Sequence, residues 1–389
     1  MTTTSAIDVV CLGESMVTFL PSRPGPLADV PSFARAIGGA ESNVACALAR
    51  AGFRTRWVSR VGADGFGDHL VRAIAAHGVD TSAVERDLER PTGIYFRTDG
   101  ERPTGPAPGR GSGPEGGPAR DPEASAALSE VLYYRAGSAA SAMSPATVPP
   151  EALRAGRVLH LTGITAALSA GCLALLRALT SGRPGPDGAA APWDGGPAPL
   201  VSFDVNYRAG LWRTAPEPGA EVLRELARHS DLVFVGEDEA AAAWGVTGGP
   251  AAVRDALPEP AVLVVKQGSA GATAFVADGP AVFAPALEVD VVSPVGAGDA
   301  FAAGFLAGTL RGLPVRERLR HGHVMAAAAL TDAGDLAAPP PGHVADRLAG
   351  LDDDAWGRLR LGPGWTTARA PEAADAGRTG GEEPEVPSV

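Results

Sequence analysis

Short apolar runs separated by helical stretches recur along this chain, and this alternation limits what it can fold into. The runs lie at residues 8–12, 55–61, 158–161, 200–204, 232–235 and 262–266, and a helical pattern at 40–51 is closed by Gly52. Strands and helices that alternate in this way build a mainly parallel sheet with helices on both faces. Such strands are buried on both sides, and ligands bind at their carboxyl ends. We therefore predict an α/β fold with its site at that edge of the sheet.

The composition excludes several classes of protein. The 389 residues are 45% hydrophobic, which is ample for the core of one large α/β domain. A net charge of −12 without a basic stripe argues against binding to nucleic acid. The sequence shows no run of membrane-span length and no signal-peptide pattern at its start, so we expect a cytoplasmic protein without membrane association. The three scattered cysteines fit core thiols in a reducing compartment.

Two segments interrupt the alternation. Residues 99–123 and 182–199 are rich in Gly and Pro and lack periodicity, so we predict disordered surface insertions there. The tail, residues 363–389, has a similar composition, and we expect it to be disordered too. The first insertion is flanked by β-like residues 92–98 and 131–135, which look like the two arms of a hairpin with a lengthened tip.

Residues 291–301, VVSPVGAGDAF, carry the strongest chemical signal. They predict a strand end, a loop of small residues and the start of a helix, where unpaired backbone N–H groups and the helix dipole favour an anion. Gly296 and Gly298 would let that anion approach bare backbone. Asp299 then has two interpretations: it caps the helix, or it is a base beside the anion site.

This loop resembles the second signature of the ribokinase-like (PfkB-type) sugar kinases, Asp-Thr-x-Gly-Ala-Gly-Asp, with Ser293 at the position of the first acid. The resemblance implies that Asp299 takes the proton from the sugar hydroxyl, while Gly296, Ala297 and Gly298 hold the transferring phosphoryl group. It also implies a ribokinase-like three-layer core in a single domain over residues 6–350. A small β lid would come from parts of 16–37 and 91–136.

The sugar side shows further resemblances. Residues 38–45, GGAESNVA, resemble the family's first signature, which implies that Gly38, Gly39 and Asn43 contact the sugar. Ribokinases and fructokinases carry an acid near the end of the run at 13–20, where this chain has Thr18. Loss of an acid there would lower the repulsion against a negatively charged substrate.

Residues 133–141, YYRAGSAAS, resemble a run of the 2-keto-3-deoxygluconate kinases. Strand alternation puts Tyr133 and Arg135 on one face, and Tyr95 should lie across the hairpin from them. The substrate implied is a sugar acid. Arg135 and Arg208, the latter in DVNYR at 204–208, would bind its carboxylate through two parallel hydrogen bonds each.

Lys266 is the only lysine of the chain, against 32 arginines. Either it is a surface survivor, or its position needs the compact ammonium that arginine cannot supply. Gln267 follows it, so the chain has no Walker A loop. Residues 266–271, KQGSAG, resemble the family's Lys-x-Gly-x-x-Gly turn beside the nucleotide phosphates. The ATP contacts implied are Lys266, Gly268, Gly271, Gly298 and, on the adenine side, His323.

Residues 234–239, FVGEDE, resemble the family's Asn-x-x-Glu element, with Gly236 in place of the Asn. The resemblance implies that Glu239 organises Mg²⁺ through water. A plain helix start with acids in its first turn gives the same pattern.

Together these resemblances imply an ATP- and Mg²⁺-dependent kinase that phosphorylates 2-keto-3-deoxygluconate on its terminal hydroxyl, and we expect a homo-oligomer. Two alternatives stay open: a kinase of the same family for fructose, tagatose or another neutral sugar, and a binding protein of weak or no activity on that fold. A dinucleotide oxidoreductase fits less well, because Phe301 stands where the third glycine of G-x-G-x-x-G is required.

Overall fold

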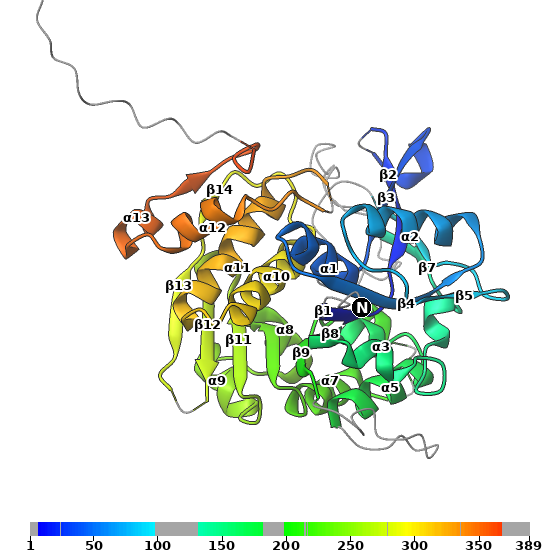
Figure 1. Cartoon of the computed structure of the whole chain (residues 1–389), viewed down its shortest axis with the longest axis horizontal. Coiled ribbons are helices and arrows are strands. Elements are labelled where there is room, and N and C mark those ends of the chain that lie inside the picture. The colour runs from blue at the N-terminus through cyan, green and yellow to red at the C-terminus, as the bar shows by residue number, and fades with distance from the viewer. Residues whose placement is uncertain are drawn as a thin grey trace, which may run out of the picture.

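The structure is a computed structural model that describes residues 7–97, 131–181 and 198–367, apart from the single positions 24, 214, 216, 278 and 335. Its centre is a nine-stranded sheet in the order β13-β12-β11-β10-β9-β8-β1-β4-β5 (Figure 1). All neighbours pair in parallel except β12, which is antiparallel to β11 and β13. The strands are β1 (Ile7–Leu12), β4 (Thr55–Gly62), β5 (Val84–Asp87), β8 (Gly156–Thr162), β9 (Leu200–Asp204), β10 (Leu232–Gly236), β11 (Val262–Lys266), β12 (Gly271–Val276) and β13 (Val282–Pro285).

Successive residues of each central strand enter different cores, because side chains alternate across a sheet. In β1, Val9 and Cys11 join one apolar cluster, whereas Val10 and Leu12 join the other. The first cluster is covered by α1 (Ala40–Arg50), α2 (Gly65–Ala76), α10 (Ala297–Leu310) and α11 (Val315–Leu330). The second is covered by α3 (Pro150–Arg154), α5 (Ala170–Ser181), α7 (Gly219–Arg228), α8 (Glu237–Trp244) and α9 (Gly249–Ala256). The predicted α/β fold, with a mainly parallel sheet between two helical layers, is confirmed.

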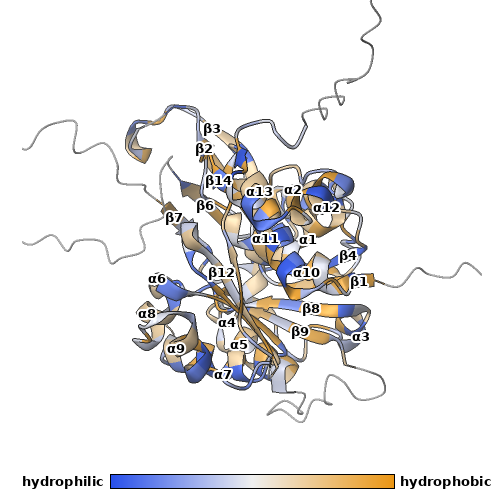
Figure 2. Ribbon diagram, turned by 90° about the vertical axis from the view of Figure 1, so that its left-hand side faces the viewer, coloured by the Kyte–Doolittle hydropathy of each residue, from blue (hydrophilic) through white to orange (hydrophobic). Residues whose placement is uncertain are grey.

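A second sheet stands off one side of this core (Figure 2). Its strand order is β3-β2-β6-β7, formed by β2 (Met16–Pro21), β3 (Phe33–Gly38), β6 (Ile94–Arg97) and β7 (Val131–Tyr134). Phe19 stacks on Phe96 on one of its faces, with ring centroids 4.7 Å apart. Tyr95 and Tyr133 lie opposite one another in the β6–β7 pairing, as the hairpin interpretation predicts. We call this second sheet the small sheet.

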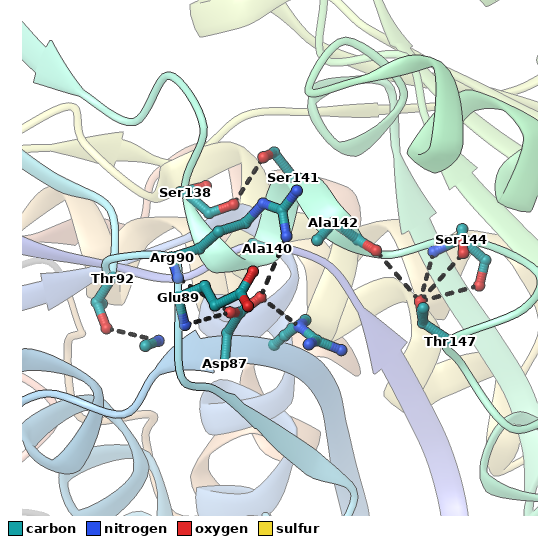
Figure 3. A network of polar contacts seen from close by, with 12 residues as sticks. Asp87, Glu89, Arg90, Thr92, Ser138, Ala140, Ser141, Ala142, Ser144 and Thr147 are labelled. Carbon is teal, nitrogen blue, oxygen red and sulfur yellow. Dashed lines mark hydrogen bonds and ion pairs between the residues drawn. The ribbon is translucent and has the colours of Figure 1, made fainter.

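A polar network ties the segments that lead into and out of the small sheet (Figure 3). The Asp87 carboxylate accepts hydrogen bonds from the backbone N–H groups of Glu89 and Arg90, each at 2.9 Å, and from Arg60 Nε at 2.8 Å. The Ala139 N–H donates to the carbonyl of Pro91 at 2.8 Å. These bonds fix the two connections that carry β6 and β7 relative to the main sheet.

The packed chain continues beyond residue 350, where the predicted domain ends. After α12 (Gly342–Ala349) come α13 (Asp353–Gly357) and β15 (Arg360–Leu361), and β15 pairs with β14 (Glu288–Val289). Trp356 is 1% exposed, and its indole N–H donates to the carbonyl of Pro285 at 2.9 Å. The predicted insertion at 99–123, and nearly all of the segments 182–199 and 363–389, lie outside the described residues. No helix in the described ranges has both the length and the apolarity to cross a membrane.

Candidate active site

The start of α10 forms the centre of the candidate site. Its N-cap residue is Gly296, whose φ of 78° lies in the left-handed region that favours glycine, and it provides no side-chain cap. The N–H groups of the first turn, which includes Ala297 and Gly298, can therefore serve an external anion. Asp299 lies in that first turn but is not the N-cap residue. Of its two sequence interpretations, the structure disfavours the simple cap.

Asn43 reaches Asp299 from the first part of α1. Its side-chain amide donates to Asp299 Oδ2 at 2.8 Å across 256 positions of sequence. We expected Asn43 to contact the sugar, whereas here its N–H₂ group orients the carboxylate. One carboxylate oxygen is thus held in place within the same turn as the uncapped N–H groups.

Gly38 and Gly39 bring this helix start against the small sheet. A Cβ on Gly38 would lie 2.3 Å from the Tyr95 hydroxyl oxygen, and one on Gly39 would lie 2.5 Å from the backbone oxygen of Glu14. Neither approach is possible for a residue with a side chain. The two glycines, Asn43 and Tyr95 are therefore gathered in one region, next to Asp299.

Tyr133 and Arg135 lie next to one another, as the sequence predicts. The rings of Tyr95 and Tyr133 are 5.4 Å apart, and the Arg135 guanidinium lies 5.8 Å from the Tyr133 centroid. Arg135 already has an acidic partner: it forms an ion pair with Glu14, and the two side chains are 11% and 1% exposed. Ser138 Oγ donates to Glu14 Oε1 at 2.5 Å. The positive charge of Arg135 is thus largely balanced within the protein.

Arg208 differs from Arg135 in this respect. It precedes the short helix α6 (Ala209–Trp212), and its side chain is 39% exposed. Its guanidinium donates to the carbonyl of Tyr207 at 3.0 Å and lies 3.5 Å from Glu239 Oε1. Of the two arginines predicted to bind a carboxylate, Arg208 is the more accessible and the less tightly paired.

Glu239 lies in the first turn of α8 and is part of the helix cap. Its Oε2 accepts from the Gly236 N–H at 2.8 Å. Burial raises the pKa of this carboxyl, although the positive charges of Lys266 and Arg208 oppose the shift. The structure therefore shows the helix start with acids in its first turn that the sequence also predicts. The Oε1 atom of Glu239 does not cap the helix and lies on the side of Arg208.

Lys266 ends β11 and points to Asp204 at the end of β9. Its ammonium lies 2.9 and 3.1 Å from the two carboxylate oxygens. Burial alone would lower the pKa of Lys266, but the negative charges of Asp204, Glu239 and Asp299 outweigh it and raise that pKa. Lys266 is thus no surface survivor but part of a partly buried cluster of charges.

The turn after Lys266 is built by glycines at positive φ. Gly268 has φ 57° and Gly271 has φ 139°, and a Cβ on Gly271 would lie 2.3 Å from the carbonyl oxygen of Ala284. Both predicted ATP-contact glycines therefore sit in the tight β11–β12 turn beside Lys266.

The expectation for His323 needs correction. Its side chain is buried between Phe301 and Trp356, and its Nε2–H donates to the carbonyl of Ala284 at 3.0 Å. Burial lowers its pKa to about 4, so the ring is neutral at physiological pH. The sequence position matched an adenine-side residue of the family, but packing makes His323 part of the core.

This geometry agrees with the comparison with known families. Residues 6–155 and 197–341 match the description "pfkB family carbohydrate kinase". The chain belongs to the pfkB family. The Gly296–Asp299 turn and the Gly38–Asn43 segment, which resemble the two signatures of that family, both lie within the matched residues.

Among curated pfkB-type relatives, the chain is 33% identical over 233 residues to a 2-dehydro-3-deoxygluconokinase of Bacillus subtilis. It is 32% identical over 241 residues to the enzyme of that name from Thermoproteus tenax, and 26% identical over 235 residues to fructokinase-2 of Solanum habrochaites. The first match covers 59% of this chain and 60% of the relative, and the second covers 62% of each. The aligned region thus spans about three fifths of these relatives.

Solved structures show the same fold. A PfkB protein from Polaromonas sp. JS666 superposes with a TM-score of 0.67 at 33% identity, covering 84% of this chain and 97% of that one. A putative ribokinase II from E. coli, solved in complex with ATP and Mg²⁺, superposes with a TM-score of 0.70 at 22% identity, covering 88% and 98%. The ribokinase-like assignment of the fold is confirmed.

Three acidic residues of this pfkB chain were not identified as site residues from the sequence. Glu14, Asp204 and Glu41 are each at most 3% exposed. Glu14 pairs with Arg135, Asp204 pairs with Lys266, and Glu41 accepts hydrogen bonds from two threonines. The available signal was an acid inside a signature run or at the carboxyl end of an apolar strand, where a charge needs a partner.

Proposed function

We propose that this pfkB-family protein is a phosphotransferase that moves the γ-phosphoryl group of ATP to the terminal hydroxyl of 2-keto-3-deoxygluconate. The observation that carries the proposal is Asp299, which Asn43 orients at 2.8 Å within a helix turn that has no side-chain cap. A base and an anion site in one turn suit the transfer of a phosphoryl group to an alcohol.

In this reaction Asp299 accepts the proton of the sugar hydroxyl as its oxygen attacks the γ-phosphorus. The bond from that phosphorus to the bridging oxygen of ATP breaks, and ADP leaves with the electron pair. The N–H groups of the 296–298 turn donate to the phosphoryl oxygens, and Lys266 adds a positive charge beside them. Positioning of the two substrates supplies much of the remaining acceleration.

The proposal of a sugar acid rests on Arg208 and on the relatives. Arg208 presents a partly exposed guanidinium that is only loosely paired at 3.5 Å, which suits a carboxylate that binds from solution. The 2-dehydro-3-deoxygluconokinases named above are more similar to this chain than the fructokinase. Closure of the small sheet over the sugar as a lid would exclude water as a competing acceptor.

Mg²⁺ fits the residues present. It prefers one or two carboxylates together with substrate phosphates and bound water. Glu239 is the carboxylate that would hold it through water, with Oε1 as the oxygen that does not cap α8. When bound, the ion neutralises charge on the phosphates of ATP. The buried free thiols Cys11, Cys46 and Cys172 support the proposed cytoplasmic location.

The test is a coupled assay of ADP release with 2-keto-3-deoxygluconate, fructose, tagatose and ribose. We expect kcat/KM for the sugar acid to exceed that for every neutral sugar by at least about a hundredfold, the scale of losing one desolvated charge interaction. Equal or better turnover of fructose would show that the substrate is a neutral ketose and not a sugar acid. Absence of ADP release with every sugar, despite ATP binding, would favour a binding protein.

A further inference from the structure

The single lysine of this arginine-rich chain is partly buried and forms an ion pair with Asp204. The Lys266 side chain is 20% exposed and that of Asp204 is 3% exposed, and the ammonium lies within 3.1 Å of both carboxylate oxygens. Asp204 also accepts from the backbone N–H of Asn206 at 3.3 Å. A carboxylate buried to this degree is stable only when it is paired, so Asp204 and Lys266 depend on each other.

The strand order explains how the two residues meet. β10 lies between β9 and β11, and Gly236 is the residue of β10 in register with Lys266. Phe234 of β10 is in register with Asp204, so Asp204 and Lys266 lie on the same face of the sheet, on either side of β10. The lysine side chain therefore crosses the end of β10 to reach the carboxylate.

The same face of the sheet carries α10. Phe301 and Phe305 of this helix pack against Phe234 of β10, with centroids 6.4 and 5.5 Å apart. At the start of α10, a Cβ on Gly298 would lie only 3.8 Å from the Lys266 ammonium. The ammonium therefore stands next to the N–H groups that are open to an anion.

We propose that Asp204 is a positioning residue that holds the Lys266 ammonium against the anion-binding turn of α10, so that Lys266 meets the phosphoryl group during its transfer. This inference rests on the proposed kinase function. The ammonium is a compact point charge that reaches both carboxylate oxygens and lies beside the turn, whereas the guanidinium of arginine is a larger, planar group. This is the physical reason for one lysine among 32 arginines.

The experiment is a double-mutant cycle in the full chain with Asp204→Asn, Lys266→Met and the double variant. ATP affinity is measured by calorimetry without sugar, and kcat with the best sugar of the panel. We expect Lys266→Met to weaken ATP binding and to lower kcat, each at least tenfold. Asp204→Asn should lower kcat at least tenfold without weakening ATP binding, because it misplaces the ammonium but removes a negative charge. When Lys266→Met is already present, adding Asp204→Asn should change kcat less than twofold.

Independent losses that multiply in the double variant would overturn the inference, since Asp204 would then act without Lys266. Full activity of Lys266→Arg would overturn the argument from size. Asp80→Asn is the matched control: Asp80 pairs with Arg56 at 2.8 Å near the β4–β5 end of the sheet, and its loss should leave kcat within threefold. If wild type turns over no sugar, the proposed function fails, and the ATP-affinity cycle alone then decides the inference: Lys266→Met must weaken ATP binding tenfold and Asp204→Asn must not.

Discussion

Glu41 links the stability of this protein to pH in a direction opposite to that of most acids. It lies in the first turn of α1 and is fully buried. Its Oε1 accepts from Thr162 Oγ1 at 2.7 Å and Thr165 Oγ1 at 2.6 Å, while Oε2 has no hydrogen-bond partner among the described residues. A Cβ on Gly13 would lie 2.1 Å from its carboxyl carbon, so only glycine leaves it room.

Burial raises the pKa of Glu41 from 4.5 to about 7, against the two threonine hydrogen bonds and with a further push from the charge of Asp299. When the pKa of a carboxyl is higher in the folded than in the unfolded state, its contribution to the free energy of unfolding is fully present below the unfolded-state pKa, here near 4.5. This stability is lost as the pH rises through about 7. At about 1.4 kcal/mol per pKa unit, the loss amounts to about 3 kcal/mol.

Glu41→Gln removes this titration while keeping the shape and an acceptor for the threonines. We expect the difference in the free energy of unfolding, variant minus wild type, to increase by about 3 kcal/mol between pH 4.5 and pH 8. Any constant cost of burying the amide N–H₂ group shifts the whole curve and leaves its slope unchanged. Urea unfolding at several pH values measures both proteins, and Glu151→Gln, at an exposed glutamate of α3, is the control. A difference that stays flat from pH 5 to pH 8 would refute the reasoning.

Four further predictions concern the site and the core. Asp299→Asn should lower kcat at least about a hundredfold, with ATP affinity by calorimetry within threefold of wild type, because only the proton acceptor is lost; retention of a tenth of kcat would contradict its role as base. Arg208→Ala should cost about 2–4 kcal/mol in kcat/KM for the sugar acid and much less for a neutral sugar, and an equal loss on both would exclude a carboxylate contact. Arg135→Ala should lower the free energy of unfolding by about 3–5 kcal/mol in urea titrations, since it leaves the buried Glu14 carboxylate without its ion-pair partner. Trp356→Ala should cost about 3–5 kcal/mol of stability in the same assay, which a chain packed only to residue 350 would not show.

Several features followed from the sequence because they depend on short-range patterns. β9 and β11 begin and end where predicted, at 200–204 and 262–266, because strands buried on both faces are continuous apolar runs with polar ends. The open start of α10 followed from the small residues of 291–301, and the facing of Tyr133 and Arg135 followed from strand alternation.

The partners of the buried charges were decided by the tertiary structure alone. Asp204 meets Lys266 across 62 positions because their strands flank β10 and both residues lie on the same face of the sheet, and Glu14 meets Arg135 because the small sheet folds back onto the end of β1. His323 became a core residue through Phe301 and Trp356, which no local pattern links to it. Periodicity reports which face of an element a side chain occupies. The charge that it meets there depends on strand order and on where distant glycines leave space, and these are properties of the assembled sheet.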